Sequence, residues 1–300
     1  MNRAGARNEA PMAFDVRAME NIATAPASRA DRLVAAWLLA GIVACFAVLL
    51  PFSNLHFSPA TSFVPAVLGA AVFAQVLTAL LFYAQYRVAR QPQLAILSLA
   101  YAASSVLTLF YMLTFPRVFS ATGLLHAGAQ TAPWIAVFER ALFDGSLIVF
   151  ACADRFGWRS RRATIRGLAA AVAVLVAALV LIAILAPLPP LVAGDYATPL
   201  WIHVIAPFNV VAALVAIALL ATSGLRTVTQ VWLLVVAAIY LFEAFANLAF
   251  SGSRYTLGWY SGRSFVFGGS TVILAVFLVK INDMVCLLYT SPSPRDRQKS

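Results

Sequence analysis

The sequence predicts an all-α polytopic integral membrane protein with eight transmembrane helices and both termini in the cytoplasm. Of its 300 residues, 62% are hydrophobic and 11% are charged, whereas soluble domains are about half apolar and about a quarter charged. The apolar residues form blocks of roughly 20, the length at which a helix crosses a bilayer. They do not alternate with polar residues in segments of about ten, as the strands of an outer-membrane barrel would.

The apolar blocks are separated by short connections that contain helix-breaking residues. The expected spans are 33–52, 63–86, 94–115, 133–153, 166–186, 202–222, 228–250 and 265–285. Proline removes a backbone donor and clashes with the preceding turn, and glycine weakens a helix through its backbone entropy. In chain order the breaks fall at 51–59, at Gln91 and Pro92, at 116–133, at Gly157, at 187–199, at Ser223 and Gly224, and at 251–262. None of these connections is long enough to hold a soluble domain.

The chain before the first span is polar, contains two prolines, and has neither a helical nor a strand period. We therefore expect residues 1–32 to form a disordered cytoplasmic leader. A cleaved signal peptide is the alternative, but the polar stretch is long and the block that follows it is long enough to span a membrane.

The end of the chain has an unusual sequence. Residues 286–296 read Cys-Leu-Leu-Tyr-Thr-Ser-Pro-Ser-Pro-Arg-Asp, which resembles the translation of a sequencing-library transposase adaptor. We expect residues 286–300 to be a non-native tail derived from that adaptor, residues 33–285 to be the membrane domain, and a native cytoplasmic output domain to be missing after it. The alternative is a genuine tail rich in Pro, Ser and Arg.

The basic residues predict the orientation of the spans. Placing the N-terminus inside puts 14 of them in the cytoplasm and three outside, as the positive-inside rule requires. The inner set is Arg3, Arg7, Arg17, Arg29, Arg32, Arg87, Arg90, Arg155, Arg159, Arg161, Arg162, Arg166, Arg226 and Lys280, and the outer set is Arg117, Arg254 and Arg263. Since the net charge of +10 lies mainly in loops between spans, it indicates membrane topology and excludes nucleic-acid binding. The expected location is the inner membrane of a bacterium, with the lipid bilayer as partner.

Motifs for catalysis are absent from the sequence. It contains no GxSxG, HExxH, Walker-type loop, CxxC or strand-linked GxGxxG, so we expect no catalytic residues and no cofactor. Cys45, Cys152 and Cys286 are isolated from one another and from histidine clusters, so neither a disulfide framework nor a metal site is expected.

Ionisable residues inside the spans are the candidates for function. A charge in the hydrocarbon core costs several kcal/mol unless it faces a partner or a wet cavity. Arg140 and Asp144 are spaced i, i+4 and can pair within one helix, while Glu139 points about 100° away toward another helix. The candidate ligand or signal site, at or near the outer leaflet, comprises Glu139, Arg140, Asp144, His203, Glu243, Asn247, Arg254, Tyr255, Trp259, Tyr260 and Arg263. The alternative is that the charges only fix helix packing, that the aromatics form an interfacial belt, and that His203 is an ordinary interface histidine.

Four stretches carry a resemblance to a known family. They are 73–87, 99–116, 123–134 and the motif Trp259-Tyr260-Ser261-Gly262-Arg263. In this order, across about Leu33 to Asp283, the chain resembles the bacterial membrane-associated sensor domains called MASE, type 4. It departs from that family at Arg117, where Gly is expected, and at Glu139-Arg140, where an aromatic residue and His are expected.

The resemblance implies a function in signal transduction. Such domains usually precede a GGDEF diguanylate cyclase or a histidine kinase. That domain would be the missing output domain, and the protein would form a homodimer through it. The expected function is therefore to sense an unknown small-molecule or membrane-state stimulus and to relay it through the last span, beyond Lys280 to Asp283. A small-molecule transporter or a purely structural membrane protein is the alternative.

Overall fold

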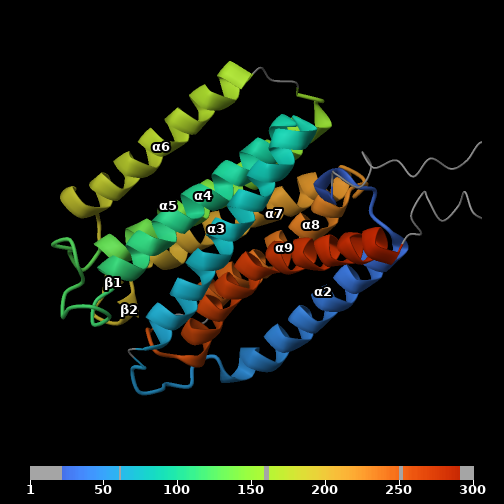
Figure 1. The fold of residues 1–300 in the computed structure, drawn as a ribbon. Coiled ribbons are helices and arrows are strands. Elements are labelled where there is room, and N and C mark those ends of the chain that lie inside the picture. Colours follow the sequence, from blue (N-terminus) through green and yellow to red (C-terminus); the bar gives the residue numbers. More distant parts are fainter. Residues whose placement is uncertain (1–21, 61, 159–161, 250–252, 291–300) are drawn as a thin grey trace, which may run out of the picture.

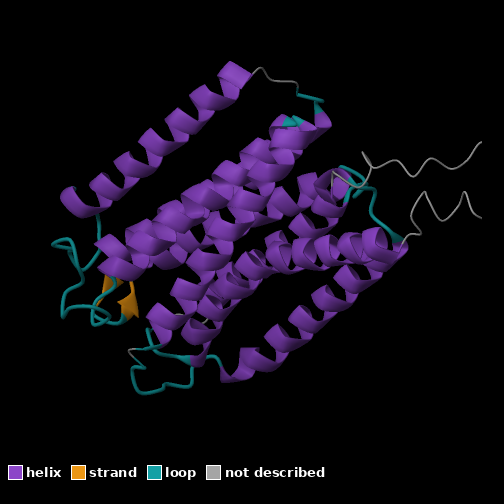
Figure 2. Cartoon of the chain, in the orientation of Figure 1, coloured by secondary structure: helices purple, strands orange, loops and turns teal. Residues whose placement is uncertain are grey.

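The chain folds into a bundle of long helices (Figures 1 and 2). The computed structural model describes residues 22–60, 62–158, 162–249 and 253–290. The long helices are α2 Arg29–Leu49, α3 Phe63–Ala89, α4 Pro92–Thr114, α5 Thr131–Arg155, α6 Arg162–Leu185, α7 Ala206–Thr222, α8 Val228–Ala249 and α9 Leu257–Thr290. The short elements are the 3-10 turns η1 Ile22–Thr24 and η2 Leu50–Phe52, the π-helical turn η3 Trp201–Ile205, and the antiparallel strands β1 Val192–Ala193 and β2 Tyr196–Ala197.

Within the described residues, seven helices are long and apolar enough to cross a membrane. The remaining long helix, α5, has 25 residues but carries Glu139, Arg140 and Asp144 in its middle. It nevertheless packs inside the bundle against α4 and α7. The predicted all-α polytopic membrane fold is thus confirmed, while the count of eight crossings stays a prediction.

The helices differ in how much of their surface they bury. The most apolar part of α4 is 61% buried and that of α8 is 67% buried, whereas α2 buries 6% and α6 buries 17%. Figure 1 shows α2 and α6 at opposite margins of the bundle. Because lipid solvates apolar side chains as well as other helices do, apolar helices are stable at such margins. The centre of the molecule is therefore formed by α4, α5 and α8.

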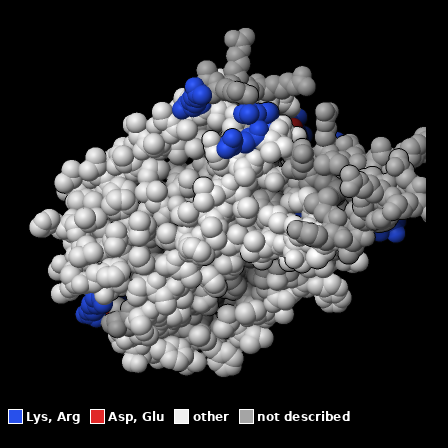
Figure 3. Space-filling model, in the orientation of Figure 1, with Lys and Arg blue, Asp and Glu red and all other residues white. Residues whose placement is uncertain are grey.

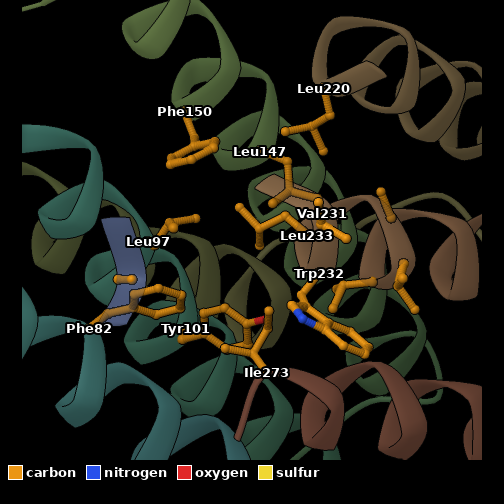
Figure 4. Packing of buried hydrophobic residues seen from close by; sticks show 14 of the residues in the cluster. Phe82, Leu97, Tyr101, Leu147, Phe150, Leu220, Val231, Trp232, Leu233 and Ile273 are labelled. Atoms are coloured by element: carbon orange, nitrogen blue, oxygen red, sulfur yellow. The ribbon is translucent and has the colours of Figure 1, made fainter. Parts of the chain in front are cut away.

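Aromatic side chains from several helices meet in the core, where Phe82 and Tyr101 lie side by side (Figure 4). The ring of Tyr101 lies 5.8 Å from that of Phe82 and 5.2 Å from that of Phe143, and Phe143 lies 5.0 Å from Tyr240. These separations are typical of favourable tilted and edge-to-face pairs. The row joins α3, α4, α5 and α8, and its last ring, Tyr240, lies against Arg140.

On the face shown in Figure 3, Lys and Arg lie toward the ends of the bundle, and the surface between them shows no charged side chains. At the end where α2 begins, Lys280 Nζ lies 2.8 Å from Asp31 Oδ1, and the Arg32 guanidinium donates to the Leu225 carbonyl at 3.4 Å. Three residues assigned to the inner set, Arg32, Arg226 and Lys280, thus belong to one end of the molecule.

The expectation of a disordered leader up to residue 32 is wrong for its last part. Helix α2 begins at Arg29, and Ile22 and Ala23 are buried. The Thr229 hydroxyl donates to the Ala23 carbonyl at 2.6 Å, and the backbone N–H of Ala23 donates to Gln85 Oε1 at 3.4 Å. A three-residue turn has no period to detect, so the sequence pattern gave no sign of it. Residues 1–21 lie outside the described residues.

The last span also begins earlier than predicted. Residues 257–262, assigned to a loop because of Gly258 and Gly262, form the first turns of α9. The Thr256 hydroxyl accepts a hydrogen bond from the Trp259 N–H at 3.2 Å, which satisfies one of the donors left over at a helix start. At its other end α9 continues to Thr290, past the expected boundary at 285.

Candidate functional site

A buried ion cluster joins α5 to α8. Arg140 donates from Nε to Asp144 Oδ2 at 3.0 Å and from NH2 to Asp144 Oδ1 at 3.1 Å. Its NH1 lies 3.6 Å from Glu243 Oε2 on α8, and its guanidinium carbon lies 3.9 Å from the centroid of the Tyr240 ring. Arg140 is 4% exposed and Asp144 is 1% exposed. The i, i+4 spacing places the first pair on one helical face, as the sequence indicates.

Glu139 points to different helices from its neighbour Arg140. Its Oε1 accepts a hydrogen bond from the Ser104 hydroxyl on α4. The Gln75 amide on α3 donates to Ser104 Oγ at 3.3 Å and to Ser270 Oγ on α9 at 3.1 Å. All four side chains are buried. A chain of polar contacts therefore crosses from α5 through α4 and α3 to α9.

Two adjoining cavities lie beside the ion cluster, and Glu139, Arg140 and Glu243 line the inner one. Each cavity is small, with a volume of about 60 Å³ for the inner one and about 60 Å³ for the outer one. The polar residues on the inner cavity are Thr108, Tyr111, Glu139, Arg140, Trp201, Asn209, Glu243 and Arg263. The polar residues on the outer cavity are Tyr111, Asp195, Trp201, Ser253, Arg254, Trp259 and Arg263. Since Tyr111, Ala136, Trp201 and Arg263 line both, they form the boundary through which one cavity meets the other.

Arg263 is held at this boundary by two aromatic residues. It donates from NH2 to the Tyr111 hydroxyl at 3.2 Å, and its guanidinium carbon lies 4.4 Å from the centroid of the Trp259 ring. Trp259 precedes Arg263 by one turn of α9, so both project from the same face. The early start of α9, which the sequence analysis missed, is what gives them this common face.

A small hairpin covers the outer cavity. The Gln130 side chain, just before α5, donates to the Val192 carbonyl at 2.6 Å and accepts from the Leu191 N–H at 2.8 Å. The Arg254 N–H donates to the Asp195 carbonyl at 2.7 Å. These bonds fix the β1–β2 turn at the end of the bundle opposite the Asp31–Lys280 pair.

The structure brings some of the predicted site residues together and places others elsewhere. Glu139, Arg140, Glu243, Arg254, Trp259 and Arg263 line one or both cavities, and Asp144 supports them through Arg140. His203 is exposed and lines neither cavity.

Tyr255 and Tyr260 belong to the surrounding scaffold. The Tyr255 carbonyl accepts from the Phe57 N–H at 2.9 Å, and the Tyr260 hydroxyl accepts from the Ala60 N–H at 3.1 Å. Both contacts hold the loop that follows η2. The side chain of Asn247 lies outside the described residues.

Several residues of the site were missed in the sequence analysis. Asn209 follows Pro207 by two positions in an otherwise apolar span, and Gln75 and Gln85 lie ten residues apart in the second span, too sparse to predict a translocation path. Tyr111 and Trp201 are of the residue types that are common at membrane interfaces. A polar side chain deep in an apolar span indicates a functional site. Only the fold shows which of these polar residues face the same cavity.

Together these features define the class of protein: an integral membrane domain with an internal polar site between its helices. The chain belongs to the MASE4 family, the membrane-associated sensor, integral membrane domain, whose model matches residues 58–285. This confirms the family resemblance seen in the sequence, and the match begins after α2 rather than at about residue 33. A membrane sensor domain is not itself catalytic. No protein of curated function and no solved structure matches the chain.

Proposed function

We propose that this chain is the sensory module of a signalling protein in a bacterial inner membrane. A stimulus acts on the paired cavities from outside the cytoplasm, and α9 relays the change to a cytoplasmic output domain, a diguanylate cyclase or a histidine kinase. In this proposal α5 is the eighth crossing, and both the start of α2 and the end of α9 are cytoplasmic.

The observation that supports this proposal best is the reach of α9. From Leu257 to Val285, before the expected non-native tail, this helix is roughly 43 Å long at about 1.5 Å per residue. It contributes Arg263 to both cavities and Ser270 to the polar chain. Farther along, its Lys280 pairs with Asp31 at the opposite end of the bundle. One continuous helix therefore joins the site to the end of the bundle at which the proposed output domain attaches.

A close contact couples the ion cluster to α9. A Cβ atom placed on Gly269 would lie 3.1 Å from Cζ of Tyr240, the residue whose ring lies against Arg140. Without a side chain at Gly269, α9 can lie directly on that ring, as small residues allow between membrane helices. A change in the position of Arg140 is thus passed to Tyr240 and then to the backbone of α9. A packing difference of a few kcal/mol is enough to shift a two-state equilibrium.

A fusion to an output domain tests the relay. A diguanylate cyclase domain is joined after Val285 in helical phase with α9, and cyclic di-GMP is measured in cells. Gly269→Ala is expected to change the output several-fold, because the new methyl group must displace Tyr240. Gly268→Ala is the matched control, since a Cβ there meets no atom within 4 Å.

The outcomes separate the proposal from its alternatives. Equal output from the two glycine variants at equal membrane abundance would refute a relay through this contact. A transporter would instead accumulate a solute in proteoliposomes that contain the full chain. In a purely structural protein, removal of Glu243 or Arg263 would alter folding and nothing else.

A further inference from the structure

Three buried carboxyl groups gather at the ion cluster and the inner cavity. Glu139 is 8% exposed, Asp144 is 1% exposed, and the side chain of Glu243 is 13% exposed. Among the described residues, the cations at this site are Arg140, which lies between the carboxylates, and Arg263, which lines the inner cavity. Three carboxylates against two guanidinium groups leave one negative charge in excess. A buried carboxyl group takes up a proton when its charge is not balanced.

Glu139 is the carboxyl group that the arginines hold least. Arg140 donates two hydrogen bonds to Asp144 and places NH1 3.6 Å from Glu243 Oε2. Within the described part of the chain, Glu139 makes no ion pair, and the hydrogen bond that it accepts comes from the neutral hydroxyl of Ser104. The excess negative charge is therefore assigned to Glu139.

The polar chain that begins at Glu139 has already used its donors. The Ser104 hydroxyl donates to Glu139, and the two N–H groups of the Gln75 amide donate to Ser104 and Ser270. The Ser270 hydroxyl donates to the Val266 carbonyl at 2.8 Å. In contrast, Gln75 Oε1 is buried and accepts no hydrogen bond from any described residue. Since a proton on Glu139 would add a donor to this chain, the count of donors and acceptors favours a neutral Glu139, as the count of charges does.

The two cavities have room for water beside Glu139. Each has a volume of about 60 Å³, whereas one water molecule needs about 10–15 Å³ measured in the same way. The Asn209 side-chain oxygen is buried, makes no hydrogen bond to a described residue, and belongs to a residue that lines the inner cavity. The outer cavity extends to Asp195, which is exposed. Water in the cavities can therefore exchange protons between Glu139 and the end of the bundle that the hairpin covers.

The helices packed around Glu139 contribute few other groups that titrate. The titratable and charged groups that they bring to this region are Arg140 and Asp144 on α5, Tyr101 and Tyr111 on α4, Tyr240 and Glu243 on α8, and Arg263 on α9. The polar side chains from α3 and α7 are the uncharged amides of Gln75 and Asn209, and α6 carries its charges only in its first turns, at Arg162 and Arg166. Tyrosine hydroxyls are neutral near pH 7. The charge balance at Glu139 therefore depends on the carboxylates and the two arginines.

We propose that Glu139 is a proton-binding site that is loaded through water in the two cavities. A hydronium ion in the inner cavity transfers its proton to the Glu139 carboxylate, which leaves a water molecule and a neutral carboxyl group. Release of the proton restores the excess negative charge next to Ser104, at the start of the polar chain that ends at Ser270 on α9. The inference names the proton as the ligand of the proposed sensory site and rests on the proposed function only for the relay to an output domain.

Infrared difference spectroscopy of the full chain in lipid nanodiscs tests this inference, because a protonated carboxyl group has its own C=O band. Exposed carboxyl groups have released most of their protons by about pH 5. The wild-type chain is expected to show a band at about pH 5 that loses at least half of its area by about pH 9. Glu139→Gln is expected to lack this band. Asp154→Asn is the matched control, since Asp154 lies on α5 but outside the site, and it is expected to retain the band.

Two further measurements separate proton binding from a structural role. Glu139→Gln keeps the side-chain volume and an acceptor for Ser104, so it is expected to unfold at the same temperature as the wild type, or at a higher one, at about pH 9. Ser104→Ala removes a hydrogen bond that favours the charged form of Glu139. The midpoint of the titration is therefore expected to move upward by about one pH unit in Ser104→Ala. A purely structural role of Ser104 would leave that midpoint unchanged.

The outcomes decide for or against the proton site. Loss of the band in Glu139→Gln, with retention in Asp154→Asn and an upward shift in Ser104→Ala, supports the inference. A band that does not change with pH, or that persists in Glu139→Gln, overturns it. A titration that moves to lower pH when sodium chloride replaces choline chloride also overturns it, because a metal cation would then compete for the carboxylates. These measurements involve no output domain, so a failed relay in the cyclase fusion does not affect them.

Discussion

The guanidinium carbon of Arg140 lies 3.9 Å from the centroid of the Tyr240 ring, so that the single buried cation of α5 rests on an aromatic face of α8. A Cβ atom placed on Gly269 of α9 would lie 3.1 Å from Cζ of the same tyrosine. This arrangement places a charged residue, an aromatic residue and a glycine from three helices in one row. Movement of the charge therefore has a short physical route to the last helix of the chain.

We expect Arg140→Gln to destabilise the protein by about 3–5 kcal/mol, because it leaves Asp144 and Glu243 as buried carboxylates without their cation. Asp144→Asn is expected to cost less, since Arg140 keeps Glu243. Thermal unfolding of the purified variants measures the difference. The exposed Arg117 provides a control, and Arg117→Gln is expected to change stability by less than about 0.5 kcal/mol. Equal stability of Arg140→Gln and the wild type would contradict the role of the cluster in packing.

Ser28→Ala is expected to destabilise the start of α2 by about 1 kcal/mol. The Ser28 hydroxyl accepts from the Asp31 N–H at 3.0 Å, and Asp31 accepts in return from the Ser28 N–H at 3.0 Å. Hydrogen exchange of residues 29–33 reports the loss. Ser62→Ala is the comparison, because Ser62 precedes α3 without a side-chain capping bond, and it should leave exchange at both helix starts unchanged.

Gln130→Ala is expected to release the hairpin from the start of α5. Three hydrogen bonds between the Gln130 side chain and the backbone of Leu191 and Val192 are removed together. Hydrogen exchange at 191–198 should rise at least tenfold while exchange in α4 stays constant. Slow exchange of the hairpin in this variant would show that Trp134 and the other contacts hold it without Gln130.

The crossing of α5 is tested by labelling from each side. After replacement of the three native cysteines, a cysteine at the exposed Ala121, before α5, is expected to react with an impermeant thiol reagent outside the cell. A cysteine at the exposed Phe156, after α5, is expected to react only when the cytoplasmic face is opened. Labelling of both positions from the same side would remove α5 from the membrane and reduce the crossings to seven.

Much of the fold could be predicted from the sequence because lipid imposes a simple length rule on apolar helices. The pairing of Arg140 with Asp144 was also predictable, since both lie on one helix at a known spacing. The contacts of Gln75 with Ser104 and Ser270 were not, because they join three helices whose mutual rotation the sequence pattern does not specify. The early start of α9 was missed because Gly258 and Gly262 suggested a break, whereas the helix tolerates both.

The π-helical turn before α7 sets the direction of a whole wall of the site. In this turn the N–H of Ala206 bonds to the carbonyl of Trp201, five residues back, so the turn contains one residue more than an α-helix needs. Deleting that extra residue would rotate Trp201 by about 100° relative to Asn209, away from the cavities that both now line. Removal of one residue would thus turn Trp201 away from the cavity that Asn209 lines. The spacing between Trp201 and Asn209 is therefore as characteristic of the site as the identities of the two residues.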